Sequence, residues 1–419
     1  MDVTVGASCS VIGLPCSATS TLVELSTDAR AALEAADTVV GSQRQLAIVN
    51  DLLPPGAHHV PIGGDLAGLD VGLTTSQTTV VLASGDPGFF GVLRQVRARC
   101  PRHVTVAVYP AVSSVQAVFA AAGLPWDDAV VLSAHGRNPR YAVNACRRLP
   151  KTAVLTSPEF GPGELVAALD RRPRDMWVGS RLGTTAAEVT KVRIPGPGSA
   201  GEWDRWPDPN VVVLVDAEAA PATKGWSAPP RRSPTAWGLE DGAFAHRDGQ
   251  ISKAEVRAQA LAWLGPGLGD MVWDIGCGSG SVAVESARLG AAALALDRDA
   301  DQVARTRANA DAHAVPVDTH HGTAPAALAN LPDPDVAFVG GGGTDLPTIL
   351  AAVATRTHRV VVVALAALER VGPAWRALAD AGLDVNGTQV AASRLAALPD
   401  GSHHLAAANP VILLRGHRG

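Results

Sequence analysis

The segment VWDIGCGSGSVAVE, residues 272–285, constrains the fold more than any other stretch of the sequence. An apolar run ends at three alternating glycines, Gly276, Gly278 and Gly280, and a second apolar run follows them. This order predicts a strand over 271–275, a tight turn and then a helix, the setting in which a nucleotide-like ligand meets a helix N-terminus. Glycine suits such a turn because a Cβ would hold the backbone away from the ligand.

The spacing of the acidic residues around these glycines narrows the class of ligand. The pattern is D-x-G-x-G-x-G with Asp274 inside the strand end, whereas a dinucleotide fingerprint is G-x-G-x-x-G. An acid at that place repels a pyrophosphate and suits a cation such as the amino group of S-adenosylmethionine. Asp297 closes the next predicted strand, where a carboxylate can accept from both ribose hydroxyls. Two alternatives stay open: a glycine turn with no ligand, and an NAD-dependent oxidoreductase.

Short apolar runs alternate with helical stretches on both sides of one unusual segment. Residues 218–238 are rich in Pro, Ala and small polar residues and lack any apolar period, which predicts a linker between two α/β domains. A length of 419 residues fits that division. Strands are predicted over 38–40, 79–83, 104–108, 129–132, 153–155 and 211–215 in a largely parallel arrangement, and then over 271–275, 293–297, 335–339, 359–365 and 410–414. Four consecutive glycines, 340–343, indicate either a flexible loop or close approach of a large flat ligand.

The charge, the cysteines and the lengths of the apolar stretches argue against several classes of function. The formal net charge of -5 is spread without long runs of one sign, which argues against nucleic acid as a partner. The five cysteines include no C-x-x-C pair, so we expect a reduced, cytoplasmic protein without a cysteine-built metal site. No apolar stretch is long enough for a membrane span.

Several segments of the second half resemble one known family in order and spacing. AFAHRDGQISKAEVRAQALAWL (243–264), the glycine segment, ALDRD, HGTAPAAL, LPDPDVAFVGGGG and NPVILL resemble the precorrin C15-methylating and decarboxylating enzymes of cobalamin biosynthesis. The resemblance implies a Rossmann-like, S-adenosylmethionine-dependent methyltransferase domain over 239–419. It also implies cofactor contacts at Ser252, Gly276, Cys277, Gly278, Ser279, Gly280, Asp297, Thr323 and Ala324.

The first half resembles the tetrapyrrole methylase family, in particular its members that methylate precorrin carbon 5. The matching pieces are ARAALEAADTVVGSQRQL (29–46), VLASGDPGFFG (81–91), YPAVSSVQAVFAAAGLPW (109–126), SAHGR (133–137) and VLTSPEFGPGELVAAL (154–169). This resemblance implies a two-lobed domain over 1–217, with lobes of about 1–109 and 110–217 and the cofactor in the cleft between them. The implied cofactor contacts are Gly85, Asp86, Pro87, Ser113 and Ser114.

One segment departs from the tetrapyrrole methylase pattern. Residues 9–27 keep Gly13 but lack the later glycines that relatives carry after their first strand. Side chains therefore stand where backbone is expected to approach the tetrapyrrole or the cofactor. An alternative follows from this departure: only the C-terminal half is active, and the N-terminal half is a degenerate docking module.

Joined in one chain, the two halves resemble the precorrin-6Y C5,15-methyltransferases (decarboxylating). The resemblance implies methylation of precorrin-6B at carbons 5 and 15 and decarboxylation of the ring C acetate, giving precorrin-8. The expected partner is this small tetrapyrrole, without nucleic acid or membrane, and the chain is expected to form a homo-oligomer. Candidate proton donors are His320, His321 and Glu240, and candidate clamps for substrate carboxylates are Arg247, Arg298 and Arg394, each of which is equally an ordinary surface residue.

Overall fold

The fold divides into two compact units. A computed structural model describes residues 8–16, 24–63, 67–75, 78–169, 172–182, 184–194, 206–216, 236–247 and 249–418. Unit 1 holds residues 1–139 and 150–229, and unit 2 holds residues 140–149 and 230–419. Most of the predicted linker, 218–238, lies outside the described residues.

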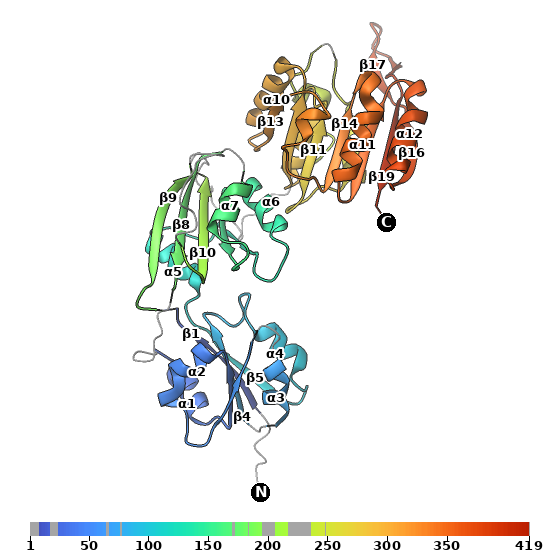
Figure 1. The fold of residues 1–419 in the computed structure, drawn as a ribbon. Helices are drawn as coiled ribbons and strands as arrows, with labels where there is room; N and C mark the ends of the chain where they lie inside the picture. Colours follow the sequence, from blue (N-terminus) through green and yellow to red (C-terminus); the bar gives the residue numbers. More distant parts are fainter. Residues whose placement is uncertain are drawn as a thin grey trace. The chain divides into compact units, whose positions relative to one another are not determined.

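The first sheet of unit 1 is fully parallel, with strand order β3-β2-β4-β1-β5. Its strands are β1 (Ser8–Leu14), β2 (Thr38–Gly41), β3 (His58–Pro61), β4 (Thr78–Ser84) and β5 (Thr105–Tyr109). The helices are α1 (Thr27–Glu34), α2 (Gln43–Val49), α3 (Ala67–Thr75) and α4 (Leu93–Arg99), with a short 3-10 turn η1 (Asn50–Leu52). Helices cover both faces (Figure 1), because Ile12 of β1 packs on the α1 side while its neighbour Val11 packs on the α3 side.

The second sheet of unit 1 is mixed, with strand order β6-β7-β10-β8-β9. It contains β6 (Val130–Ser133), β7 (Lys151–Leu155), β8 (Arg174–Ser180), β9 (Glu188–Ile194) and β10 (Asn210–Asp216), with helices α5 (Ser114–Ala122) and α7 (Pro162–Ala168). Only the β6–β7 pair is parallel; β10 runs antiparallel to β7 and β8, and β8 antiparallel to β9. The prediction of a largely parallel sheet is therefore wrong for this part. The short connection between β8 and β9 leaves no room for the crossover that a parallel pair needs.

Unit 2 is built on one seven-stranded sheet of order β13-β12-β11-β14-β15-β19-β16. The strands are β11 (Met271–Ile275), β12 (Ala292–Asp297), β13 (Asp318–His321), β14 (Val336–Gly340), β15 (Val360–Leu365), β16 (Asp384–Val390) and β19 (Val411–His417). The helices are α8 (Ala254–Leu264), α9 (Ser281–Arg288), α10 (Ala300–Ala312), α11 (Leu346–Arg356) and α12 (Val371–Asp380), with 3-10 turns η3 (Asp241–Ala243), η4 (Ala326–Leu328), η5 (Gly343–Asp345) and η6 (Leu368–Arg370). The first five strands of this order are parallel, and β19 is antiparallel to both of its neighbours.

Both faces of the unit 2 sheet are buried. Trp273 and Ile275 of β11 belong to the cluster that includes α11 and α12, whereas Val272 belongs to the cluster with α8. Burial on both faces explains why β11 reads as a continuous apolar run in the sequence. The alternation also places Asp274 on the same side of the sheet as Val272.

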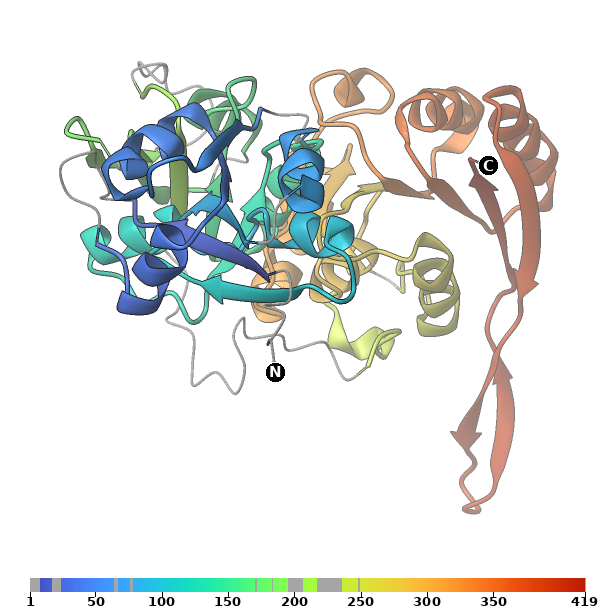
Figure 2. The same cartoon turned by 90° about the horizontal axis from the view of Figure 1, so that it is seen from below.

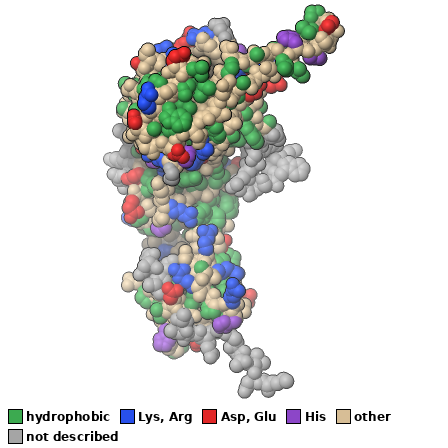
Figure 3. Space-filling model, turned by 90° about the vertical axis from the view of Figure 1, so that its right-hand side faces the viewer, with side chains coloured by type: hydrophobic (Ala, Val, Ile, Leu, Met, Phe, Trp, Pro, Cys, Tyr) green, Lys and Arg blue, Asp and Glu red, His purple; other side chains and the backbone are tan. Residues whose placement is uncertain are grey.

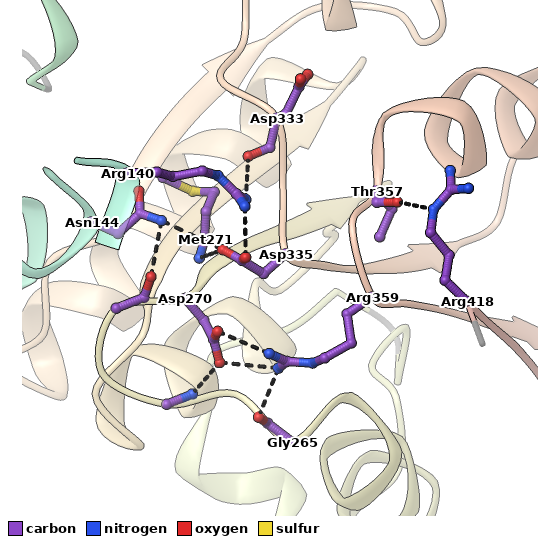
Figure 4. Close-up of polar contacts among 12 residues, drawn as sticks. Arg140, Asn144, Gly265, Asp270, Met271, Asp333, Asp335, Thr357, Arg359 and Arg418 are labelled. Atoms are coloured by element: carbon purple, nitrogen blue, oxygen red, sulfur yellow. Dashed lines mark hydrogen bonds and ion pairs between the residues drawn. The ribbon is translucent and has the colours of Figure 1, made fainter. Parts of the chain in front are cut away.

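Charged side chains fix the edge of unit 2 where β11 and β14 begin (Figure 4). Helix α6 (Arg140–Arg148) is grouped with unit 2 by its contacts. Arg140 forms an ion pair of 2.8 Å with Asp335, whose other oxygen accepts from Met271 N at 2.7 Å. Arg359 pairs with Asp270 at 3.0 Å. This network lies at the amino ends of the strands, so it leaves their carboxyl ends free for a ligand.

A two-stranded hairpin extends away from the rest of unit 2 (Figure 2). It consists of β17 (Ser393–Ala397) and β18 (His403–Ala407), which pair only with each other in the described part of the chain. Leu395 and Leu405 stand directly opposite each other and are 72% and 67% exposed. An isolated hairpin is marginally stable in water, so these apolar side chains are the part of unit 2 that most needs a cover.

Candidate functional site

Unit 2 has a cavity of about 220 Å³ at the carboxyl ends of β11, β12 and β14. From β11 the strand order runs through β12 to β13 on one side and through β14 to β15 on the other, so the cavity lies at the switch point where open α/β sheets bind ligands. Its lining consists of Ile275, Gly276, Leu296, Asp297, Arg298, Gly322, Thr323, Ala324, Val339, Gly340, Gly341, Gly342, Gly343, Asp345 and Ile349. The structure therefore brings Gly276, Asp297, Thr323 and Ala324 of the predicted cofactor contacts together.

The three alternating glycines serve different purposes. A Cβ at Gly276 would lie 2.0 Å from the carbonyl oxygen of Gly340, and a Cβ at Gly280 would lie 2.3 Å from the Thr306 side chain. A Cβ at Gly278 would meet nothing within 4 Å, although its φ of +56° favours glycine. Two glycines are thus required by the packing of the protein itself, and one faces open space beside the turn.

Asp297 connects the glycine turn to the cavity. Its Oδ2 accepts from the backbone N–H of Gly278 at 3.0 Å and its Oδ1 accepts from Asp299 N at 3.0 Å. Each carboxylate oxygen has more than one acceptor position, so both can still accept a bond from a ligand in the cavity. The two backbone bonds hold the carboxylate in a fixed orientation.

Asp274 lies beneath the turn, outside the cavity lining. Its side chain is buried and Oδ2 accepts from Ala283 N, in the first turn of α9, at 3.0 Å. Burial raises the pKa of Asp274 to about 7, the Ala283 N–H opposes this rise, and the Asp297 charge adds to it. The predicted contact between Asp274 and a cationic group stays a prediction; what the structure shows is a carboxyl that caps α9.

The other predicted residues of the turn also bond to protein. Cys277 contacts the Thr306 hydroxyl at 3.4 Å, and burial followed by the nearby Asp274 charge raises the pKa of its thiol. Ser279 is buried, and its carbonyl accepts from Asn309 at 2.8 Å. These bonds make the turn rigid.

Sequence reasoning missed one charged residue of the cavity. Asp345 lines it at the end of the four-glycine segment, directly before α11. The signal was present, because an acidic residue stands between glycines and the Leu-Pro that opens a helix. Of the three predicted arginine clamps, only Arg298 lines the cavity.

The remaining predicted residues of this half lie elsewhere. The carbonyl of Ser252 accepts from Arg257, which forms a fully buried ion pair with Glu285. Arg247 pairs with Asp299, and Arg394 with Asp241 and Glu255. His320 pairs with Asp318, His321 contacts the carbonyl of Arg298, and Glu240 begins the η3 turn.

Unit 1 has a larger cavity, of about 850 Å³, lined from both of its sheets. Backbone and side chains at the ends of β1, β4, β6 and β7 contribute. The lining residues are Leu14, Pro15, Cys16, Arg44, Gly63, Ser84, Gly88, Phe90, Gly91, Val92, Leu93, Arg94, Gln95, Arg97, Ser114, Ser133, His135, Arg137, Leu155, Thr156, Gly179, Leu182, Pro209, Asn210 and Val211.

The charge of this cavity is positive. Arg44, Arg94, Arg97 and Arg137 line it, and no Asp or Glu appears among its described lining residues. Figure 3 shows Lys and Arg side chains gathered in the lower half of that view, over unit 1. Within the described ranges, the guanidinium groups of Arg94 and Arg137 form no ion pair, so they are available to a ligand with several carboxylates.

The SGDPG loop forms one wall of the unit 1 cavity. Gly85 donates to Leu14 O at 2.8 Å, and Asp86 Oδ1 accepts from Gly88 N at 2.8 Å. The Pro87 carbonyl accepts from Leu93 N at 3.2 Å. The next two predicted residues follow β5: Ser113 caps α5 by a reciprocal bond with Gln116, and Ser114 lines the cavity.

The segment after β1 carries the departure noted in the sequence. A Cβ at Gly13 would lie 2.0 Å from the carbonyl oxygen of Gly85, so this glycine is required by the close approach of β1 to the residue that follows its parallel neighbour β4. Leu14, Pro15 and Cys16 then line the cavity with side chains. Residues 17–23 lie outside the described residues.

The described residues meet the requirements neither of a membrane-spanning helix nor of a metal site. No described helix has the length and apolar content needed to cross a membrane. Within the same residues, no group of three or more His, Cys, Asp or Glu side chains is placed to hold a metal ion.

Two family profiles match consecutive parts of the chain. Tetrapyrrole (corrin/porphyrin) methylases match residues 10–196, and a precorrin methyltransferase domain matches residues 242–413. The first match covers the two sheets around the arginine-lined cavity through β9, and the second covers the sheet with the glycine turn.

Curated relatives match up to about three quarters of the chain. A Sinorhizobium precorrin-6Y C(5,15)-methyltransferase [decarboxylating] is 32% identical over 77% of this chain and 76% of the relative. A probable cobalt-precorrin-6B C(15)-methyltransferase (decarboxylating) of Pyrobaculum calidifontis is 39% identical over 38% of this chain and 84% of the relative. A cobalt-precorrin-7 C(5)-methyltransferase of Salmonella typhimurium is 33% identical over 44% and 90%.

Proposed function

The chain belongs to the precorrin-6Y C5,15-methyltransferase (decarboxylating) family, and we propose on that basis that it converts precorrin-6B into precorrin-8. The conversion comprises methylation at carbons 5 and 15 and decarboxylation of the ring C acetate, with S-adenosylmethionine as methyl donor. The observation that carries the proposal is the presence of two cavities of different chemistry, each within the unit matched by the corresponding family.

The unit 2 cavity fits S-adenosylmethionine. Asp297 would hold the ribose hydroxyls, because its carboxylate is oriented by two backbone N–H groups and lines the cavity. Thr323 and Ala324, in the loop that follows β13, would lie at the adenine side of the cofactor. Gly341 would let the ligand touch main chain, since a Cβ there would meet nothing within 4 Å.

Bound S-adenosylmethionine supplies a methyl group that is already activated by the sulfonium, so the residues of the chain mainly align the reactants. Asp297 and Asp345 place negative charge around the unit 2 cavity, which favours a cationic donor. The rigid turn, held by Thr306 and Asn309, keeps this geometry fixed. Decarboxylation requires a place for two electrons, and the conjugated macrocycle of the substrate is suited to accept them.

The unit 1 cavity fits a large ligand with several carboxylates. Four guanidinium groups around about 850 Å³ match a tetrapyrrole that carries acetate and propionate groups. The SGDPG loop and Ser114 would hold the methyl donor for carbon 5 on one wall of the same cavity. Gly85, Asp86, Pro87 and Ser113 would support that wall through the bonds described above rather than line it.

The alternative of an inactive N-terminal half is not favoured. The full-length relatives at 32% identity are named for methylation at both carbons. The test is incubation of the full chain with precorrin-6B and S-adenosylmethionine, followed by mass spectrometry of the products. A product with two added methyl groups and one lost carboxyl is expected, and a product that stops after one methyl and the lost carboxyl would restore the alternative.

We also propose that the chain forms a homo-oligomer through the β17–β18 hairpin. The exposed Leu395–Leu405 pair supports this, because a second copy of the hairpin could cover both side chains. Light scattering should give a multiple of the 42.9 kDa chain mass, and Leu395→Asp with Leu405→Asp should reduce it to one chain. An unchanged mass in the double variant would contradict the role of the hairpin.

A further inference from the structure

Phe90 stands out in the wall of the unit 1 cavity because its backbone is strained. Its φ is +54°, in the left-handed region that glycine adopts at no steric cost. A bulky aromatic residue in this region is an outlier, and such strain persists only where the surroundings fix it. Phe90 is followed by Gly91, yet the strained position itself is not a glycine.

The surrounding loop fixes this conformation. Phe89 N donates to Asp86 O at 3.1 Å, and Leu93 N donates to Pro87 O at 3.2 Å. A Cβ at Gly91 would lie 2.6 Å from the Pro87 carbonyl, so the chain is tightly folded on both sides of Phe90. Phe89 packs against the core cluster of the second sheet and meets Phe90 edge-on, with ring centroids 5.2 Å apart. One side of the Phe90 ring is thus held in place by Phe89.

Phe90 stays half exposed despite its contact with Phe89. The residue is 49% exposed and lines the cavity that carries the four arginines. Among the described lining residues it is the only Phe, Tyr or Trp. A strained residue with an exposed aromatic ring is difficult to explain by packing, because glycine would make the same turn without strain.

We propose that Phe90 is a stacking surface for the conjugated face of the tetrapyrrole, and so a substrate-positioning residue of unit 1. The proposal rests on the proposed function of that unit and names the subsite that receives the apolar centre of the ligand. The arginines would hold the carboxylate rim while Phe90 contacts the macrocycle between them. Stacking on Phe90 would fix the plane of the macrocycle, which contacts to the carboxylates at its rim do not fix by themselves.

The test compares Phe90 variants of the full chain in binding uroporphyrin III, a flat tetrapyrrole with eight carboxylates, followed by its absorbance. Phe90→Gly should lower the affinity about tenfold, while the thermal unfolding midpoint of unit 1 stays level or rises because strain is removed. Phe90→Leu should also weaken binding, and Phe90→Trp should retain it. With precorrin-6B, Phe90→Gly should raise the KM of carbon-5 methylation more than it lowers kcat.

The control is Trp126→Leu, which removes another exposed aromatic ring of unit 1 that stacks on Phe119 and lies outside the cavity. It should leave uroporphyrin III binding unchanged. Wild-type affinity in Phe90→Gly, or a loss of binding that merely follows a lowered unfolding midpoint, would overturn the proposal while leaving the function of unit 1 intact. Failure of the wild type to bind any tetrapyrrole would overturn the site assignment and the Phe90 proposal together.

Discussion

Each unit needs a glycine near the end of its first strand, and the two segments differ after that position. In unit 1 a Cβ at Gly13 would lie 2.0 Å from the Gly85 carbonyl, and in unit 2 a Cβ at Gly276 would lie 2.0 Å from the Gly340 carbonyl. In each unit the close approach of the ends of two neighbouring parallel strands requires a glycine. After that point unit 2 continues with glycines, whereas unit 1 continues with side chains that line its cavity.

This comparison of Gly13 with Gly276 shows that a glycine near the end of a strand is not by itself evidence of a ligand. Gly13, Gly276 and Gly280 are accounted for by contacts with protein, and the ligand enters through what lies next to them. In unit 1 this is a large cavity with four arginines, and in unit 2 a smaller one with Asp297 and Asp345. The unit 1 cavity is therefore positive, which suits the carboxylates of the substrate, whereas the unit 2 cavity carries two carboxylates beside Arg298, which suits the cationic methyl donor.

The largest expected effect separates the glycines of the unit 2 turn. Gly276→Ala places a Cβ against a backbone carbonyl, which no side-chain rotation can relieve, and should cost unit 2 more than about 3 kcal/mol of stability. Gly278→Ala points into open space and should cost only about 1–2 kcal/mol for its positive φ. Denaturant unfolding of the two variants measures the contrast. Equal losses would mean that the close contact with Gly340 is not what requires glycine.

A second test concerns the positive charge of the unit 1 cavity. Arg94→Ala should lower uroporphyrin III affinity about 10- to 100-fold, because one charge-assisted contact is lost. Arg99→Ala is the matched control, since Arg99 pairs with Asp70 and does not line the cavity. Titrations at two salt concentrations check the origin of the effect, and a similar loss in both variants would point to general charge instead of a defined site.

A third test addresses the acidic character of the unit 2 cavity. Asp297→Asn should weaken S-adenosylmethionine binding to unit 2 about tenfold, because one ribose acceptor becomes a donor. Asp299→Asn, next to it but outside the cavity lining, should bind normally. Calorimetric titration provides the comparison, and unchanged affinity in Asp297→Asn would remove the ribose assignment.

A fourth test concerns the pH dependence of unit 2. Because the pKa of Asp274 is raised from 3.8 to about 7, the native state retains a proton that the unfolded chain releases between these values. The stability of unit 2 should therefore fall as pH rises through this window and level off above it. Asp274→Asn should be more stable than wild type at pH 8, with a difference that shrinks toward pH 4. A constant difference in thermal unfolding at both pH values would contradict the shift.

The sequence predicts an element of the fold where its residue pattern is compatible with only one kind of structure. The strand predicted over 271–275 coincides with β11, and Asp297, Thr323 and Ala324, which the resemblance implies as cofactor contacts, line one cavity in the structure. The position of Asp274 in the sequence does not suffice to predict where its side chain lies. Strand periodicity puts it on the face opposite Trp273, under α9, so its carboxyl caps a helix instead of lining the cavity.

Other features depend on information that local patterns lack. Val-rich runs read alike in parallel and antiparallel sheets, so the reversed direction of β10 could not be predicted. The strain at Phe90 likewise has no sequence pattern, because the residue looks like any apolar side chain in a turn. The direction of β10 depends on pairing with strands that are distant in the chain, and the conformation of Phe90 depends on how its own loop closes.

On the proposed function one chain carries two separate sites for the methyl donor, and the number of donor molecules bound per chain distinguishes this from a single site. Isothermal titration of the full chain with S-adenosylmethionine should give two molecules per wild-type chain. Gly278→Val, which places a side chain in the open space beside the unit 2 turn, should reduce the ratio to one. A ratio of one for the wild type would contradict the account.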